Sequence, residues 1–142
     1  MATNDVVQVL DRIRKRDPSR PEAQLQADIY QLLTMGVMNL GVDEVARIEV
    51  PTNDGTRRRL DIEVGHCCIE VKKDLRTGNV LTAARAQLAG YVKKQAETFG
   101  TRYVGILTDG TTWHLHRLED DNLIEVARLD AGRAEPDDIM VW

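Results

Sequence analysis

The sequence predicts an α/β domain with one mixed central sheet, and three observations carry this prediction. Apolar residues recur at helical spacing in three stretches, at 6–13, 25–33 and 81–96. In between and afterwards, apolar and polar residues alternate with the period of two that is typical of strands. The longest helical stretch leads into an almost wholly apolar strand, which indicates a parallel crossover within the sheet.

Two short helices are expected at the start of the chain. The first has one apolar face and ends before Asp17-Pro18-Ser19, where the proline disfavours a helical residue before it. For the second, Ser19 is a residue type that caps helices, Pro21 suits the first turn, and Glu22 stands three residues after Ser19, as in a capping box. Gly36 is expected to end this helix.

Three strands are expected next, at 45–50, 59–64 and 67–72. The first two are joined by 51–55, whose Asp-Gly pair favours positive φ. The second and third are joined by Gly65-His66. Connections this short predict two antiparallel hairpins.

The rest of the chain completes the sheet. A helix is expected from Val80 to Phe99, and the strand at 102–108 is nearly all apolar, which is typical of a strand buried on both faces. The Asp109-Gly110 turn precedes an alternating strand at 112–118, and a last strand is expected near 123–129. The predicted order is α-α-β-β-β-α-β-β-β.

Composition favours a single domain over residues 1–142, with a core at about 21–118 and an acidic C-terminal segment at 119–142, because 142 residues suffice for one hydrophobic core. The apolar end at 139–142 suggests the N-terminal module of a longer protein. No stretch approaches the roughly 18 apolar residues of a membrane span, and no signal peptide is recognisable. We therefore expect a cytoplasmic protein with no membrane partner, and the two cysteines, which are neighbours in sequence, fit a reducing compartment.

The overall charge argues at first against a nucleic-acid partner. With 19 Lys and Arg against 23 Asp and Glu, the formal net charge is −4. However, residues 119–138 hold eight acids and two bases, a local charge of −6, so the other residues together carry +2. This distribution predicts nucleic acid on the active-site side, with the acidic segment turned away.

Three polar residues interrupt the apolar hairpin of the second and third strands. Glu70 and Lys72 are two residues apart, so they project from one face at about 6.6–7 Å spacing, and Asp61 reaches that face from across the hairpin. Carboxylate oxygens are ligands that Mg²⁺ prefers, and Mg²⁺ takes waters and phosphate oxygens as its remaining ligands. The set therefore predicts a divalent-cation site that activates water.

The pattern Asp61-x8-Glu70-Val71-Lys72 resembles the PD-(D/E)xK nuclease superfamily, which includes many restriction endonucleases and DNA-repair nucleases. The resemblance implies a restriction endonuclease-like, three-layer α/β/α core. The family's core order is a helix, a three-stranded meander, a helix and a strand, and the elements expected over 21–108 match it.

Further features support the resemblance, and one departs from it. Gln87 and Tyr91 form a Gln-x-x-x-Tyr pair on one helix face, which resembles a motif of RecB-like and type I restriction nucleases. Glu22 would correspond to the acidic residue that many members carry on the first core helix. Leu60 stands where the family often has proline.

The resemblance implies a metal-dependent deoxyribonuclease that hydrolyses phosphodiester bonds. Asp61, Glu70 and the backbone carbonyl of Val71 would hold one or two Mg²⁺ ions, for which Mn²⁺ could substitute, and Glu22 would help to position them. Lys72 would orient the attacking water or stabilise the developing charge.

The catalytic set would also include Gln87 and Tyr91, which would hold the site or touch the substrate backbone. The setting would be a restriction or other defence system, with a homodimer or with fused or associated methyltransferase or translocase domains. The alternative is a DNA-binding or scaffold module of the same fold that does not cleave. The intact Asp61, Glu70 and Lys72 set favours cleavage.

Basic residues near the predicted site are the expected DNA contacts. They are Arg57, Arg58, Arg59, Lys73, Arg76, Arg85 and Lys94. Aromatic residues for stacking on single strands are few, with one Phe, three Tyr and two Trp, so duplex DNA is the expected partner. A charged turn explains the run at 57–59 equally well, and Lys73 also reads as surface charge.

Other interpretations stay open for several candidates. Glu22 fits a capping box as well as a metal site, and Tyr91 fits core packing as well as a catalytic role. A solvated strand face explains Glu63 without any chemistry, and it is favoured over a ligand pair for His114 and His116.

Overall fold

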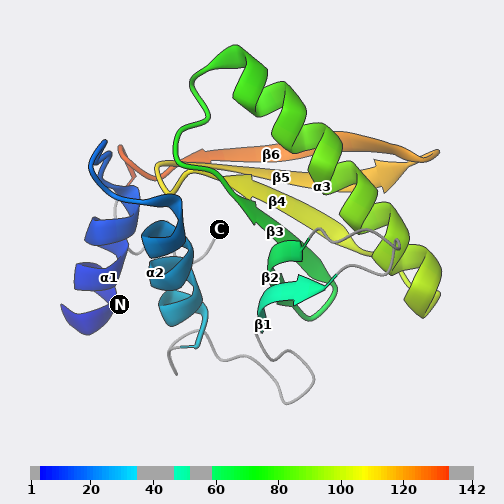
Figure 1. Cartoon of the computed structure of the whole chain (residues 1–142), viewed down its shortest axis with the longest axis horizontal. Coiled ribbons are helices and arrows are strands. Elements are labelled where there is room, and N and C mark those ends of the chain that lie inside the picture. Colours follow the sequence, from blue (N-terminus) through cyan, green and yellow to red (C-terminus); the bar gives the residue numbers. More distant parts are fainter. Residues whose placement is uncertain (1–3, 35–46, 52–58, 135–142) are drawn as a thin grey trace.

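The computed structural model describes residues 4–34, 47–51 and 59–134, which form a mixed α/β structure (Figure 1). The chain begins with helices α1 and α2, then three strands, the long helix α3 and three more strands. The bounds are α1 Asn4–Arg14, α2 Glu22–Thr34, β1 Arg47–Pro51, β2 Arg59–Val64, β3 Cys67–Val71, α3 Gly78–Phe99, β4 Val104–Thr108, β5 Thr112–Glu119 and β6 Asn122–Asp130.

The strands form one six-stranded sheet in the order β1-β2-β3-β4-β5-β6. Neighbouring strands are antiparallel except for β3 and β4, which run parallel, with Glu70 opposite Leu107 and Val71 opposite Thr108. Because α3 forms the connection between these two strands, the predicted crossover and mixed sheet are confirmed. The carboxyl ends of β3 and β4 consequently lie at the same edge of the sheet.

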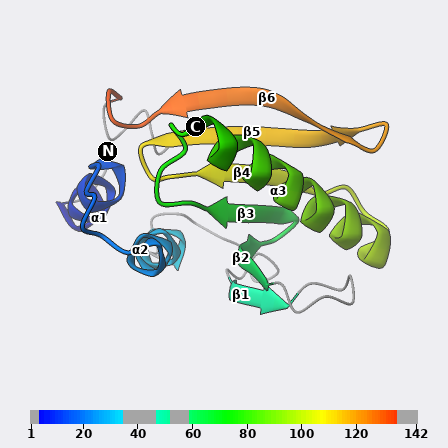
Figure 2. The same cartoon turned by 45° about the horizontal axis from the view of Figure 1, so that its top comes forward.

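Helices pack on both faces of the sheet (Figure 2). Helices α1 and α2 form one core with the strand residues Ile62, Ile69 and Val71. Helix α3 forms a second core with Cys68 and Leu107 from the opposite face. This separation follows from the alternation of side chains along each strand, which sends neighbouring residues of β3 into different cores.

Two glycines allow tight connections around this sheet. Gly100 ends α3 in the left-handed region, with φ of 63°. Gly110, in the turn between β4 and β5, has φ of 84°, and a Cβ atom there would lie 2.2 Å from the carbonyl oxygen of Ile13. The close approach of α1 to this turn therefore requires glycine.

Candidate functional site

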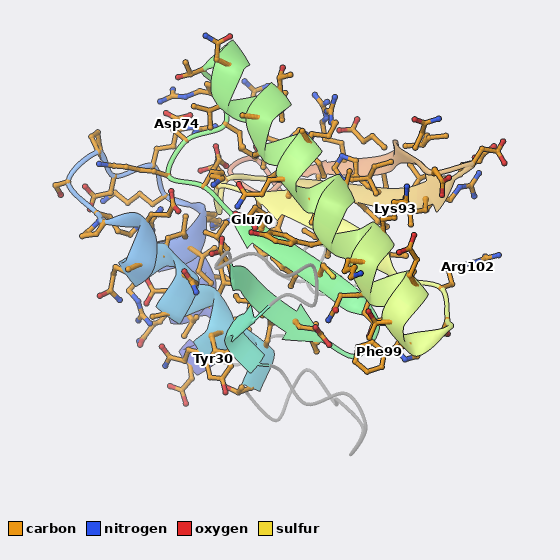
Figure 3. All side chains as sticks on the ribbon, turned by 45° about the vertical axis from the view of Figure 1, so that its right-hand side comes forward. Tyr30, Glu70, Asp74, Lys93, Phe99 and Arg102 are labelled. Carbon is orange, nitrogen blue, oxygen red and sulfur yellow. The ribbon has the colours of Figure 1, made fainter. Side chains whose placement is uncertain are left out.

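The predicted site residues of the hairpin come together where β2 and β3 are covered by α3. Asp61 Oδ2 accepts a hydrogen bond of 2.8 Å from the backbone N–H of Val71. Lys72 Nζ lies 3.3 Å from Glu70 Oε1, and the Lys72 N–H donates to the carbonyl of Thr108 on β4. Figure 3 shows Glu70 beside α3, with Asp74 on the loop that leads into that helix.

Burial and like charge perturb both carboxyl groups. Glu70 is 2% exposed, and burial, together with the neighbouring charge of Asp61, raises its pKa to about 8. Burial also raises the pKa of Asp61, and the negative charge of Glu22 adds to this effect. The site thus holds more negative charge than Lys72 compensates, and a bound cation would stabilise the ionised forms.

One oxygen of Glu70 marks where a cation would fit. Glu70 Oε2 is buried and accepts no hydrogen bond, and the carboxyl group of Glu70 lies within hydrogen-bonding reach of that of Asp61. Among the residues that the structure describes, no group of three or more His, Cys, Asp or Glu side chains is arranged to hold a metal ion. Two carboxylates suit Mg²⁺, which usually keeps several waters and takes only one or two protein carboxylates.

Helix α2 borders the site from the other face of the sheet. Glu22 is its first residue and lines the same pocket as Lys72. The buried Gln26 donates a hydrogen bond of 3.1 Å to the carbonyl oxygen of Asp61. The capping-box interpretation of Glu22 is wrong, because Pro21 directly precedes the helix and the N–H and hydroxyl of Ser19 both donate to Asp17.

Helix α3 contributes the Gln-x-x-x-Tyr pair. Gln87 Nε2 donates a hydrogen bond of 2.8 Å to the hydroxyl of Tyr91, and Gln87 Oε1 lies 3.5 Å from Lys72 Nζ. Tyr91 is 2% exposed and belongs to the core beneath α3. The core-packing interpretation of Tyr91 therefore holds. Its hydroxyl also contacts Gln87, whose Oε1 lies near Lys72, and its catalytic role stays a prediction.

The interpretation of Glu63 as a residue on a solvated face is wrong. Glu63 is buried and accepts a hydrogen bond of 2.6 Å from Gln95 Nε2. The reason is that α3 covers this part of β2. Gln95, which is also buried, was not a candidate, although its position four residues after Tyr91 and eight after Gln87 places all three on one helix face.

The same interpretation is wrong for His114 and His116, which lie buried on β5. His114 Nδ1 lies 2.7 Å from Glu125 Oε1, and His116 Nδ1 lies 3.4 Å from the carbonyl oxygen of Gly105. Burial lowers the pKa of His116. Alternation alone did not show that this strand face is covered.

A pocket of about 580 Å³ opens beside Lys72. One side is formed by the α1–α2 connection, and the other by the β3–α3 loop and the first turns of α3. Its lining residues include Arg16, Arg20, Glu22, Lys72, Lys73, Asp74, Arg76, Gln87 and Asp109. The pocket thus combines the predicted catalytic lysine with a lining of five basic and four acidic residues.

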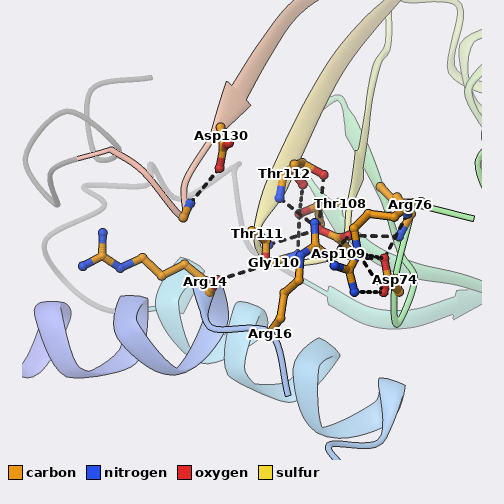
Figure 4. Close-up of polar contacts among 12 residues, drawn as sticks. Arg14, Arg16, Asp74, Arg76, Thr108, Asp109, Gly110, Thr111, Thr112 and Asp130 are labelled. Carbon is orange, nitrogen blue, oxygen red and sulfur yellow. Dashed lines mark hydrogen bonds and ion pairs between the residues drawn. The ribbon is translucent and has the colours of Figure 1, made fainter. Parts of the chain in front are cut away.

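Arg16 joins the segments that form this pocket (Figure 4). Its Nη1 lies 3.1 Å from Asp74 Oδ1 and 2.9 Å from Asp109 Oδ2. The Asp109 side chain is fully buried and also accepts hydrogen bonds from the backbone N–H groups of Leu75 and Thr112. Sequence reasoning missed Arg16 and Asp109, because their partners are distant in the sequence.

The expected DNA contacts lie in different places. Lys73 and Arg76 line the pocket, and Arg76 also pairs with Asp74 at 2.7 Å. Arg85 lies 3.7 Å from Glu125 of β6. Lys94 is half-buried on α3 and is not among the pocket-lining residues. Arg57 and Arg58 lie outside the described residues, as does the side chain of Arg59.

Comparison with known proteins identified no matching family model, curated protein or solved structure. In the described parts of the chain, none of the helices has the length and apolar character needed to cross a membrane.

Proposed function

We propose that this chain is a Mg²⁺-dependent DNA endonuclease domain with a restriction endonuclease-like fold. The observation that carries the proposal is the buried Glu70, whose carboxyl group interacts with that of Asp61 and with the ammonium group of Lys72 and whose Oε2 accepts no hydrogen bond. Helices on both faces of a mixed sheet support the same fold. A role in a restriction or other defence system would follow from the resemblance of the motif.

Asp61, Glu70 and the carbonyl of Val71 would hold the ion, with Glu22 at the border of the site. When bound, Mg²⁺ would lower the pKa of a coordinated water and neutralise charge on the phosphate. Asp61 is held by the Val71 N–H, so one of its oxygens is already oriented by the strand. This hydrogen bond holds the Asp61 carboxylate in a fixed position on the sheet.

Lys72 would act on the substrate rather than on the metal. Its side chain is 23% exposed at the pocket, and the nearby carboxylates, Glu70 foremost, keep its pKa raised against the opposing effect of burial. Lys72 is therefore a cation that can orient the attacking water or stabilise charge on the phosphate. Gln87, held by Tyr91, would orient the Lys72 ammonium group.

The substrate would be DNA, with its backbone approaching the pocket. Lys73 and Arg76 at the rim are placed to contact phosphates that flank the scissile bond. Glu125, from the acidic segment, pairs with Arg85, His114 and Arg128, so part of that segment's charge is compensated within the protein. Such an arrangement is compatible with a polyanionic partner.

Incubation with supercoiled plasmid DNA tests the proposal. We expect nicking with Mg²⁺ or Mn²⁺, none with EDTA, and a loss of at least about 100-fold in Lys72→Ala, as for other groups that stabilise developing charge. Lys93→Ala is the matched control, because Lys93 lies on α3 outside the pocket and is 47% exposed. Nicking that persists in EDTA and in Lys72→Ala would contradict the proposal. DNA binding without nicking would favour the scaffold alternative.

A further inference from the structure

Glu63 and Gln95 form a buried polar pair behind the candidate active site. Both residues are 3% exposed, and Gln95 Nε2 donates to Glu63 Oε2 at 2.6 Å. A hydrogen bond in a buried site is electrostatically stronger than one in water. The pair is therefore a strong directional link between α3 and β2.

The two residues of the pair lie on the same faces of β2 and α3 as the candidate site residues of those elements. On β2, Glu63 follows Asp61 by two residues, so both project from the same strand face about 6.6–7 Å apart. On α3, Gln95 follows Gln87 by eight residues, a distance of about 12 Å along the same helix face. Each partner of the pair thus shares a rigid element with a residue of the site.

Helix α3 also contacts the sheet through apolar packing and through the ion pairs of Arg85 with Glu125 and of Lys93 with Asp121. Its buried residues Ala84, Leu88 and Val92 make apolar contacts, which are non-directional. By contrast, the link from Gln87 to Lys72 is long, at 3.5 Å, and lies at the pocket. The short buried bond from Gln95 is therefore a directional contact that opposes sliding of the helix over β2.

We propose that Glu63 and Gln95 are positioning residues of the candidate metal centre. Their hydrogen bond fixes the register of α3 against β2, and with it the place of Asp61, a proposed metal ligand, relative to Gln87. This inference rests on the proposed function. Because displacement of a site by about 1 Å can cost about 100-fold in rate, a remote pair of this kind affects the reaction without touching substrate.

Two measurements on Gln95→Leu test the role of the pair. We expect Mn²⁺ affinity, measured by calorimetry without DNA, to fall about tenfold, because loss of the hydrogen bond to Glu63 frees the strand that carries the proposed ligand Asp61. Plasmid nicking is expected to fall by at least the same factor. Glu97→Leu is the matched control, since Glu97 is exposed on the same helix. Circular dichroism checks that each variant is folded.

The exchanged pair Glu63→Gln with Gln95→Glu separates positioning from a charge effect. Gln95→Glu alone places two carboxylates together, so it is expected to be worse than Gln95→Leu. The double variant restores the hydrogen bond with its direction reversed, and we expect affinity and nicking within about twofold of wild type.

Each result bears on one of the two proposals. Wild-type affinity in Gln95→Leu, or an exchanged variant that does not recover or does not fold, would overturn the positioning role. Wild-type protein that binds Mn²⁺ and does not nick would count against the proposed function, while the affinity measurements would still decide the role of the pair. Wild-type protein that binds no Mn²⁺ would overturn the metal centre and this inference with it.

Discussion

Replacing Glu70 with glutamine is expected to stabilise the metal-free protein. Glu70 is 2% exposed, and its pKa rises from 4.5 to about 8 in the folded chain through burial and the charge of Asp61. As pH rises above 4.5, the unfolded chain releases this proton while the folded chain retains it. The free energy of unfolding therefore falls between pH 4.5 and about 8 and is constant above that range.

The size of the effect follows from the same shift. One pKa unit corresponds to about 1.4 kcal/mol, so the full penalty at pH 7 would be about 3 kcal/mol. Glutamine also removes the partner of Lys72, which offsets part of the gain. We expect Glu70→Gln to be more stable than wild type by about 1–3 kcal/mol at pH 7 in EDTA, and equal to it near pH 4.

Urea unfolding followed by circular dichroism measures this difference across the pH range. Excess Mg²⁺ is expected to stabilise wild type, because a ligand that binds only the folded chain shifts the equilibrium, and to leave Glu70→Gln unchanged. Glu97→Gln, an exposed change on α3, is the control and should follow wild type throughout. A Glu70→Gln variant that is less stable than wild type at pH 7 in EDTA, or that keeps the Mg²⁺ response, would refute this reasoning.

Two further predictions concern the framework of the site. Arg16→Met is expected to lower the free energy of unfolding by about 2–4 kcal/mol, because it leaves the fully buried Asp109 side chain without the Arg16 cation. Urea unfolding measures this change, and a loss below about 0.5 kcal/mol would contradict the prediction. Gly110→Ala is expected to cost at least about 2 kcal/mol, because its Cβ would meet the Ile13 carbonyl at a φ of 84°. In the same urea unfolding assay Gly90→Ala, with open space around it on α3, should gain about 0.5–1 kcal/mol, and equal effects at the two glycines would be inconsistent with this explanation.

Local patterns in the sequence determined the elements and part of the site. A period of two places Glu70 and Lys72 on one strand face whatever covers that face, and the structure joins them at 3.3 Å. Helical spacing likewise places Gln87 beside Tyr91, and they are hydrogen-bonded. The long helix between β3 and β4 indicated a parallel pair, since parallel neighbours need a crossover of a dozen or more residues, and the structure shows this pairing.

Only the tertiary structure decided which polar residues are buried and what they bind. Glu63, His114 and His116 alternate with apolar neighbours as solvated residues do, but α3 covers their face of the sheet. Arg16 reaches Asp74 and Asp109 across 58 and 93 residues of sequence. The physical reason is that periodicity fixes only which side of its own element a residue occupies. Burial and long-range pairing depend on which other element packs against that side.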